Sequence, residues 1–403
     1  MLLAINQLPT YGSPLSPDDA AGVDERAACE VENMLRLCPA HRPTPLFCLD
    51  QLARRLGVQR VHVKDESQRL GVGSFKALGG TFAVIRVVLD RAQRALGRPI
   101  APAELLSDEV RAVAQALTVC CATDGNHGRS VAAGARMLGV RAVIFVHEFV
   151  SPRRVAAIAA FGAEIRQVAG NYDESVTLAA RESAANDWIV VSDTSWHGYE
   201  DIPRIVTQGY TAMVREVCRA LDAPPTHVFV QAGVGGLAAA VAGHLSMVYG
   251  KARPRVIIVE PERAACLYAS HQAGRRVAVA AREPTIMAML ECYEPSVVAW
   301  RIVSRIADAF MQVTEDDAIL AMRQLAMPIA GDRPIVSGES GAAGMAGLLK
   351  VVEWRVARQI LGLDAESRVL LFSTEGATDP ASYLQHVGRT SEQVLQAGAA
   401  AVE

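Results

Sequence analysis

The chain alternates between short apolar runs and longer segments with helical periodicity, and this alternation constrains its fold more than any other feature. The short runs are rich in Val, Ile and Leu, while the longer segments carry Ala, Leu and Arg at helical spacing. This order is typical of an α/β protein with a mainly parallel sheet. The predicted strands are 61–64, 117–122, 140–147, 163–168, 188–192, 226–231, 255–260 and 369–373.

These elements group into two Rossmann-like halves. We expect residues 82–193 to form a small domain, and residues 1–81 and 194–403 to form a large domain that binds the ligand. Within the small domain, Ser151 and Pro152 provide a helix start, and Gly162 ends that helix.

Composition and charge exclude several classes of function. The chain has 403 residues, with 40 Lys and Arg against 43 Asp and Glu, for a net charge of −3. This near-neutral balance favours neither nucleic acid nor an anionic membrane as a partner. No run approaches the roughly 18 apolar residues of a membrane span. Residues 1–5 are too short for a signal-peptide core and lack a basic flank, so we expect a cytoplasmic protein.

Metal-ligand patterns are missing from the sequence. None of the eight cysteines forms a C-x-x-C pair, and no H-E-x-x-H occurs among the nine histidines. We therefore expect no metal site, and we expect most of the thiols to be small core residues.

A lysine stands at a predicted strand-to-helix junction. The segment Gly73-Ser74-Phe75-Lys76 follows the strand at 61–64 and opens a helical stretch. A desolvated lysine amine at such a junction can condense with an aldehyde. The alternative is an ordinary surface lysine beside a loop, since lysines are mostly exposed.

A glycine loop, Gly233-Val234-Gly235-Gly236, follows the strand at 226–231. Together with Glu260 at the end of the next strand, it matches a dinucleotide fingerprint and would suit an NAD-dependent oxidoreductase. Its physical content is less specific, because backbone amides at a helix start can bind any phosphate. A purely structural tight turn is the third possibility.

Three further polar loops follow predicted strands. They run from Thr123 to Arg129, from Asp193 to Glu200, and from Ser373 to Gly376. Each has an ordinary explanation: a capped turn, an interdomain linker and a Gly/Pro turn, respectively. Taken together, polar loops at the carboxyl ends of parallel strands favour one composite pocket.

This combination resembles the fold type II pyridoxal-phosphate enzymes, the relatives of tryptophan synthase β and threonine dehydratase. The resemblance runs from about residue 43 to 380 and implies two Rossmann-like, three-layer α/β/α domains. Within the family, Asp124 and the stretches 193–200, 338–341 and 373–376 resemble diaminopropionate ammonia-lyase.

The resemblance also implies a role for each matching residue in binding pyridoxal 5′-phosphate. Lys76 would hold the cofactor covalently and then serve as an acid and base. The phosphate would bind to the backbone of Gly233, Val234, Gly235 and Gly236. Asn126 would contact the pyridine 3-oxygen, and Ser373, or failing that Thr374, would face the pyridine nitrogen.

The expected substrate is inferred from the acidic residues. A β-ammonium group is cationic at neutral pH, and Asp124 and Asp193 could bind it. By resemblance, Asp124 would also remove the α-proton from the face opposite Lys76, which would allow both D and L substrates. Thr123 and Tyr172 would contact the substrate, although Tyr172 could equally be an aromatic side chain packed at a helix start.

The resemblance therefore implies a lyase that eliminates ammonia from 2,3-diaminopropionate and yields pyruvate and ammonia. Its partner would be a small amino acid, and the family expectation is a homodimer. One alternative is β-elimination or replacement on another β-substituted amino acid, as in serine and threonine dehydratases. The NAD-dependent oxidoreductase and an inactive ligand-binding relative are the others.

Overall fold

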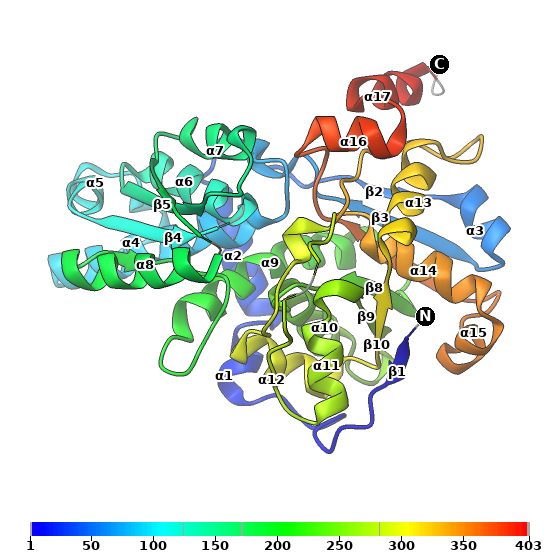
Figure 1. Ribbon diagram of the computed structural model, residues 1–403. Coiled ribbons are helices and arrows are strands. Elements are labelled where there is room, and N and C mark those ends of the chain that lie inside the picture. Colours follow the sequence, from blue (N-terminus) through cyan, green and yellow to red (C-terminus); the bar gives the residue numbers. More distant parts are fainter. Residues whose placement is uncertain (1, 124, 171, 282, 401–403) are drawn as a thin grey trace. The chain divides into compact units, whose positions relative to one another are not determined.

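The computed structural model describes residues 2–123, 125–170, 172–281 and 283–400. It divides the chain into two compact units, which we call unit 1 and unit 2. Unit 1 comprises Met1–Glu25, Pro43–Gln68 and Met213–Glu403, and unit 2 comprises Arg26–Arg42 and Arg69–Ala212. The elements are labelled in Figure 1.

The bounds of the units differ from the expected division at residues 81/82 and 193/194. Helix α4 (Lys76–Leu96) runs through the first of these points without a break, and it packs against α6 (Asn126–Leu138). Residues 69–81 and 194–212 therefore group with unit 2. Compactness and folding domains need not coincide, so the expected division stays a prediction.

The sheet of unit 1 has seven strands, whose central five are parallel. The edge strands β1 and β2 pair antiparallel with their neighbours. In spatial order the strands are β1 (Leu3–Ile5), β10 (Ala309–Val313), β9 (Arg255–Pro261), β8 (His227–Gln231), β11 (Arg368–Ser373), β3 (Arg60–Asp65) and β2 (Leu46–Cys48).

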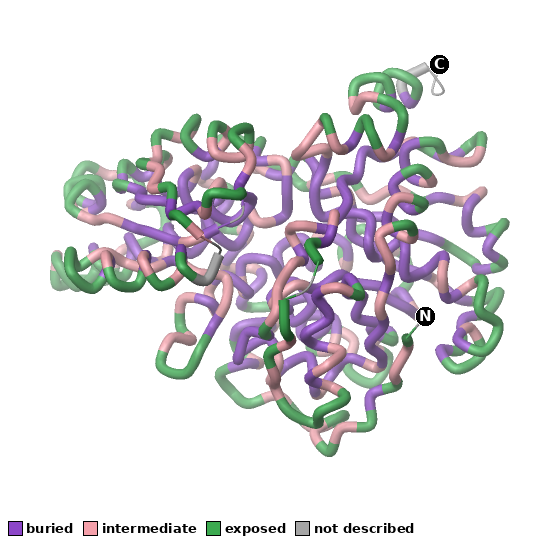
Figure 2. The backbone as a smooth tube through the Cα atoms, viewed as in Figure 1, coloured by how far each residue is buried: buried purple, intermediate pink, exposed green. Residues whose placement is uncertain are grey.

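Helices cover both faces of this sheet, which explains why its central strands are apolar throughout. Phe229 and Ile257 share a core cluster with residues of α14 (Ala343–Glu353) and α13 (Glu315–Ala326). Their neighbours along each strand are buried on the opposite face, where α10 (Gly236–Tyr249) and α11 (Cys266–Ala273) contact the sheet. Figure 2 shows these central strands as buried.

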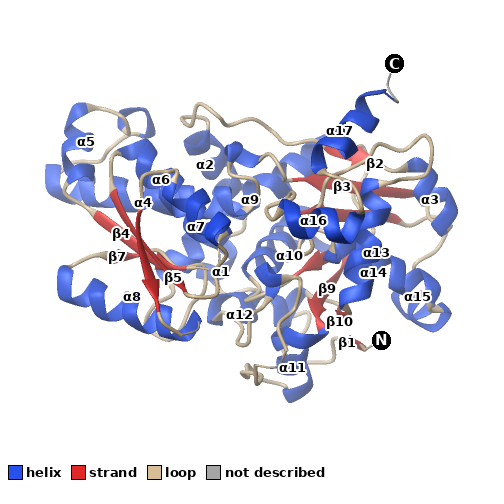
Figure 3. Ribbon diagram, turned by 45° about the horizontal axis from the view of Figure 1, so that its top comes forward, coloured by secondary structure: helices blue, strands red, loops and turns tan. Residues whose placement is uncertain are grey.

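Unit 2 has a four-stranded, fully parallel sheet, covered by α6 and by α8 (Tyr172–Asn186), as Figure 3 shows. Its strands, in spatial order, are β6 (Glu164–Val168), β5 (Arg141–His147), β4 (Thr118–Ala122) and β7 (Ile189–Val190). Cys120, Val143 and Phe145 lie in its core. Each unit is thus a three-layer α/β/α sandwich, as the sequence predicted.

The helix that begins at Lys76 packs closely on its neighbours. A Cβ atom added to Gly79 would lie 2.5 Å from Cε1 of Tyr210, on α9 (Asp201–Ala220), so this position tolerates only glycine. The remaining α-helices are α1 (Pro17–Ala21), α2 (Glu25–Leu35), α3 (Asp50–Leu56), α5 (Asp108–Gln115), α7 (Pro152–Ala159), α12 (Val297–Ile306), α15 (Arg355–Leu361), α16 (Pro380–Val387) and α17 (Ser391–Ala400).

All eight predicted strands are present, although β7 is shorter than the predicted 188–192. The predicted start of α7 is confirmed, since Oγ of Ser151 accepts a hydrogen bond from the N–H of Arg154. Strands β1, β2 and β10 are present but were not predicted from the sequence.

Within the described ranges, no helix has the length and hydropathy to cross a bilayer. The same ranges contain no group of three or more His, Cys, Asp or Glu side chains arranged to hold a metal ion.

Candidate active site

Lys76 is the first residue of α4, as the sequence predicted. The turn before it contains Gly71 and Gly73, whose φ angles of 68° and 90° suit glycine. Oγ of Ser130 donates a 2.6 Å hydrogen bond to the carbonyl of Lys76 and so ties this turn to α6. The side chain of Lys76 is 17% exposed, which contradicts the alternative of an ordinary surface lysine.

Lys76 forms an ion pair with Asp193, a residue 117 positions further along the chain. Nζ of Lys76 donates a short hydrogen bond to Oδ2 of Asp193. His127 lies beside this pair, with its Nδ1 atom 3.9 Å from the same carboxylate oxygen. Three of the predicted polar loops of unit 2 thus contribute side chains to one cluster, which we call the lysine cluster (Lys76, His127 and Asp193).

The contacts of His127 fix its tautomer. Nε2 lies 2.8 Å from the carbonyl oxygen of Val191, which can only accept, so the proton is on Nε2. Among the described residues, Nδ1 has no hydrogen-bond partner. Neutral His127 therefore turns a lone pair, not a proton, towards Asp193.

The charges of the lysine cluster follow from burial and from the ion pair. Burial raises the pKa of the Asp193 carboxyl, but the attraction of the Lys76 ammonium outweighs it and holds that pKa well below its usual value. Burial lowers the pKa of His127, which favours the neutral ring. At neutral pH, the cluster therefore contains an ionised carboxylate beside a neutral imidazole.

The loop after β4 is held by its own side chains. Oγ1 of Thr123 accepts hydrogen bonds from the N–H groups of Gly125 and Gly128, at 3.1 and 3.0 Å. These bonds make Thr123 a cap for α6, in addition to the substrate contact that we expected. Asn126 begins α6 and is 7% exposed. Asp124 lies outside the described residues.

Tyr172 is the first residue of α8, and its side chain also lies outside what the structure describes. Its expected contact with the substrate stays a prediction, as does its alternative role as an aromatic side chain packed at a helix start.

In unit 1, the glycine loop joins β8 to α10. Gly235 has a φ of 98°, and it caps α10 without offering a side chain to the first-turn N–H groups. A Cβ atom on Gly233 would lie 2.9 Å from Sγ of Cys292. A loop that is glycine at three of its four positions and lies at a helix N-terminus lets its N–H groups approach an anion closely, so it suits a phosphate.

Ser373 ends the neighbouring strand β11 and Thr374 directly follows it, at the same edge of the sheet as the glycine loop. Both are buried, and their hydroxyls differ in their partners. Oγ of Ser373 is 2.9 Å from Oγ of Ser337, whereas Oγ1 of Thr374 accepts a 3.0 Å hydrogen bond from Nε2 of Gln231.

The hydrogen bonds of Glu260 are incompatible with the ribose contact that the dinucleotide alternative requires. It is fully buried, and its two oxygens accept hydrogen bonds from the N–H groups of Leu267 and Tyr268, at 2.8 and 2.7 Å. A carboxyl group that caps α11 in this way is not available to a ribose hydroxyl.

Burial raises the pKa of Glu260 to about 8, although both backbone N–H groups favour the ionised form. This pKa exceeds that of a glutamate in the unfolded chain, about 4.3. Protonated Glu260 therefore contributes fully to the free energy of unfolding below about pH 4.3, and this contribution falls by about 1.4 kcal/mol per pH unit as the pH rises towards about 8.

We expect Glu260→Gln to reduce this fall in the free energy of unfolding when urea unfolding is compared at about pH 5 and about pH 8. The exposed neighbour variant Glu262→Gln should keep it. Equal pH dependence in all three proteins would contradict this assignment.

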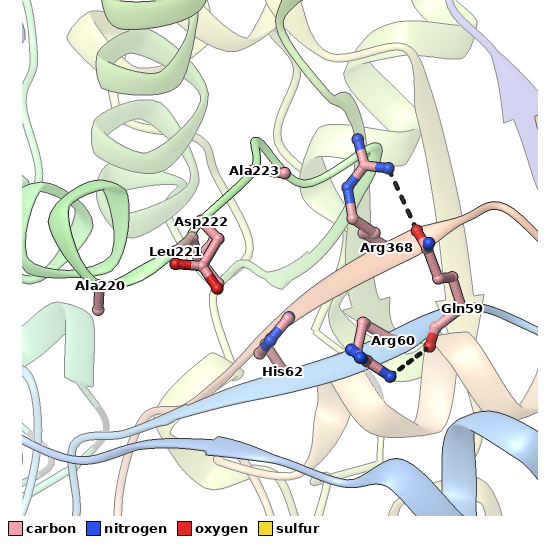
Figure 4. Close-up of a pocket in the computed structure, with 8 residues that line it drawn as sticks. All are labelled: Gln59, Arg60, His62, Ala220, Leu221, Asp222, Ala223 and Arg368. Atoms are coloured by element: carbon pink, nitrogen blue, oxygen red, sulfur yellow. Dashed lines mark hydrogen bonds between the residues drawn. The ribbon is translucent and has the colours of Figure 1, made fainter.

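A pocket of about 280 Å³ lies at the opposite edge of the unit 1 sheet. Figure 4 shows Arg60 and Arg368, which begin β3 and β11, with Nη1 of Arg368 donating to Oε1 of Gln59 at 3.3 Å. Ligands of α/β sheets bind at the carboxyl ends of the strands, and this pocket is at the amino ends. We therefore do not assign it to the active site.

The family model of the pyridoxal-phosphate-dependent enzymes matches residues 37–374. This chain belongs to that family. The match covers most of the chain and includes every described residue of the candidate site. The expected fold, fold type II, and the expected cofactor, pyridoxal 5′-phosphate, are confirmed.

Among the relatives of this pyridoxal-phosphate enzyme is diaminopropionate ammonia-lyase of Escherichia coli K12, 40% identical over 356 residues, which are 86% of this chain and 87% of the relative. The enzyme of the same name from Salmonella typhimurium is 38% identical over 86% of this chain and 88% of the relative. A crystal structure of the E. coli enzyme in complex with D-serine superposes with a TM-score of 0.85, at 35% identity, over 96% of both chains. A tomato threonine deaminase, at 21% identity and a TM-score of 0.70, shares the fold.

The residues present fit the cofactor of the family. Lys76 offers an amine at a half-buried helix start, and the glycine loop of unit 1 offers a backbone cradle that a Cβ atom would obstruct. The sequence analysis did not single out Gln231, which binds Thr374. The signal for it was present, because Gln231 is a polar residue at the end of an otherwise apolar strand.

Proposed function

We propose that this pyridoxal-phosphate enzyme is a diaminopropionate ammonia-lyase, which eliminates ammonia from 2,3-diaminopropionate. Elimination releases the β-nitrogen as ammonia, and hydrolysis of the released aminoacrylate yields pyruvate and the second ammonia. The observation that carries this proposal is the partly buried, ionised Asp193 beside the amine of Lys76. The identity of 38–40% to the named relatives supports the same substrate.

In this proposal, Lys76 would attach the cofactor through Nζ, and Asn126 would contact its 3-oxygen. The N–H groups of Gly233, Val234, Gly235 and Gly236 would hold the phosphate, and Ser373 or Thr374 would face the ring nitrogen. When bound, pyridoxal phosphate supplies the electron sink that makes the α-proton of an amino acid acidic.

The lysine cluster then handles protons and charge. The amine of Lys76, once free of the cofactor, takes the proton from the α-carbon of the substrate. Asp193, which holds the Lys76 ammonium in the structure, then binds the β-ammonium of the substrate. One cation thus replaces another beside the same partly buried carboxylate, so the charge of Asp193 does not remain unpaired.

This exchange explains the choice of substrate. A β-ammonium group has a pKa near that of a lysine, about 10, and is cationic at neutral pH. A β-hydroxyl, as in serine, carries no charge to balance the partly buried carboxylate of Asp193. A protonated β-nitrogen also leaves directly as neutral ammonia.

Asp124, Thr123 and Tyr172 complete the proposed substrate contacts. Asp124, which the structure does not describe, would take the α-proton from the face opposite Lys76 and so admit the second enantiomer. Thr123, which follows the end of β4, and Tyr172, at the start of α8, would contact the substrate.

Two assays test this proposal together. Purified holoenzyme should release pyruvate from D- or L-diaminopropionate with a kcat/KM at least about 100-fold above that for serine, since a site built for a polar group rejects an analogue that lacks it. Pyruvate should form with two equivalents of ammonia. Comparable rates with serine or threonine would instead support the dehydratase-like alternative.

We also propose that the enzyme works in the cytoplasm as a homodimer. Light scattering of the purified holoenzyme should give twice the mass of one 43.0 kDa chain. A monomer mass would contradict the dimer.

A further inference from the structure

Gln231 places an amide group beside a hydroxyl of the candidate cofactor site. It is the last residue of β8 and is fully buried. Its Nε2 atom lies near four oxygens: the carbonyls of Phe372, Gly341 and Ser340, at 2.9, 3.0 and 3.2 Å, and Oγ1 of Thr374, at 3.0 Å. All of these residues belong to unit 1.

The orientation of this amide follows from its neighbours. Three of the four oxygens are carbonyls, which can only accept, so the NH₂ end of Gln231 faces them. Oε1 of Gln231 has no hydrogen-bond partner among the described residues. The side chain therefore acts at this position as a donor only.

A donor beside Thr374 fixes the direction of the threonine hydroxyl. Because Nε2 of Gln231 cannot accept, the hydrogen bond runs from the amide to Oγ1. The proton of that hydroxyl must then point away from Gln231. Within the described part of the chain, no acceptor takes this proton, so the hydroxyl can donate to a ligand.

Ser373 differs from Thr374 in this respect. Its hydroxyl lies 2.9 Å from that of Ser337, so these two serines can satisfy each other. Of the two residues considered for the ring nitrogen, Thr374 is the one with an oriented, spare proton.

We propose that Gln231 is a positioning residue, which holds the Thr374 hydroxyl as a hydrogen-bond donor towards the ring nitrogen of the cofactor. This inference rests on the proposed function, and it names the residue that controls the electronics of the site. A donor at an unprotonated ring nitrogen favours its neutral form. A neutral ring delocalises less charge, which suits rapid expulsion of the β-nitrogen.

The test is a double-mutant cycle on the holoenzyme. Gln231→Met keeps the size of the side chain and removes the amide, and Thr374→Val removes the hydroxyl with little change of shape. We expect Gln231→Met to lower kcat about 10-fold with a smaller change in KM. We also expect the pH dependence of the visible cofactor absorption to move towards lower pH, because the ring nitrogen then protonates more readily and its positive charge lowers the pKa of the imine that gives this band.

The effect of Gln231→Met in two variants of Thr374 distinguishes positioning of the hydroxyl from simple packing. In Thr374→Val, Gln231→Met should produce no further spectral shift, whereas in Thr374→Ser, which keeps the hydroxyl, the shift should persist. An equal effect in all backgrounds, or an unchanged spectrum, would overturn the proposal. If Gln231→Met does not fold, Gln231→Glu keeps the volume and should give the same spectral shift.

This test separates the inference from the proposed function. The absorption readout needs the bound cofactor but no substrate. A protein that is yellow and inactive on diaminopropionate would refute the proposed substrate, while the spectra of the same variants would still confirm or refute the role of Gln231.

Discussion

Lys76→Ala should lower kcat on diaminopropionate by at least about 1000-fold, the largest effect that we expect from any single substitution. Two losses combine in this variant. The protein loses the amine that attaches the cofactor, and it loses the group that moves the α-proton. The visible absorption of the purified protein measures the first loss, since an imine band should be lost, and pyruvate release measures the combined effect of both losses.

A matched variant separates this chemistry from the ion pair with Asp193. Lys76→Arg keeps a positive charge beside the carboxylate, but a guanidinium stays protonated and does not condense with an aldehyde at neutral pH. We expect it to be as inactive as Lys76→Ala, yet more stable towards urea, because Asp193 keeps a partner. Lys251→Ala, at an exposed position of unit 1, should behave like the parent protein. Activity of Lys76→Arg within tenfold of the parent would refute the covalent role.

Asp193→Asn should lower kcat/KM for diaminopropionate by about 100-fold, roughly 2.7 kcal/mol of transition-state stabilisation. The substitution removes the charge that faces Lys76 in the structure and that is proposed to face the β-ammonium of the substrate. Since the Lys76 ammonium holds the pKa of Asp193 well below its usual value, the parent carries this charge at every pH from mildly acidic upward. The loss should therefore be the same at pH values from about 6 to about 9.

A comparison of activity on serine and on diaminopropionate distinguishes binding of the β-ammonium by Asp193 from an effect on Lys76 alone. Any residual activity on serine should fall much less than activity on diaminopropionate, because serine has no β-charge for Asp193 to bind. Asp201→Asn changes a carboxylate whose side chain is 96% exposed, so it serves as the control and should change neither rate. A uniform loss on both substrates would show that Asp193 acts only by holding Lys76.

Much of the fold followed from local patterns. The runs at 140–147 and 226–231 are long and apolar enough to be recognised as buried parallel strands, and both are present as β5 and β8. The strands that were missed have weaker signals. β1 and β2 have three residues each at the edges of the sheet, and β10 contains Met311 and Gln312, which interrupt the β-branched pattern. Their pairing depends on distant partners, such as Leu3 with Met311.

The sequence by itself determined the α/β class, the polar loops at the strand ends and the lysine at a helix start, because these depend on periodicity and turn chemistry within a few residues. Only the tertiary structure decided which side chains meet. Asp193 reaches Lys76 across 117 residues, and Gln231 reaches Thr374 across 143. Glu260, which suits a ribose in the sequence pattern, instead caps a helix. The physical reason is that parallel strands bring distant residues to one edge of a sheet, and no local pattern records the order in which those strands pair.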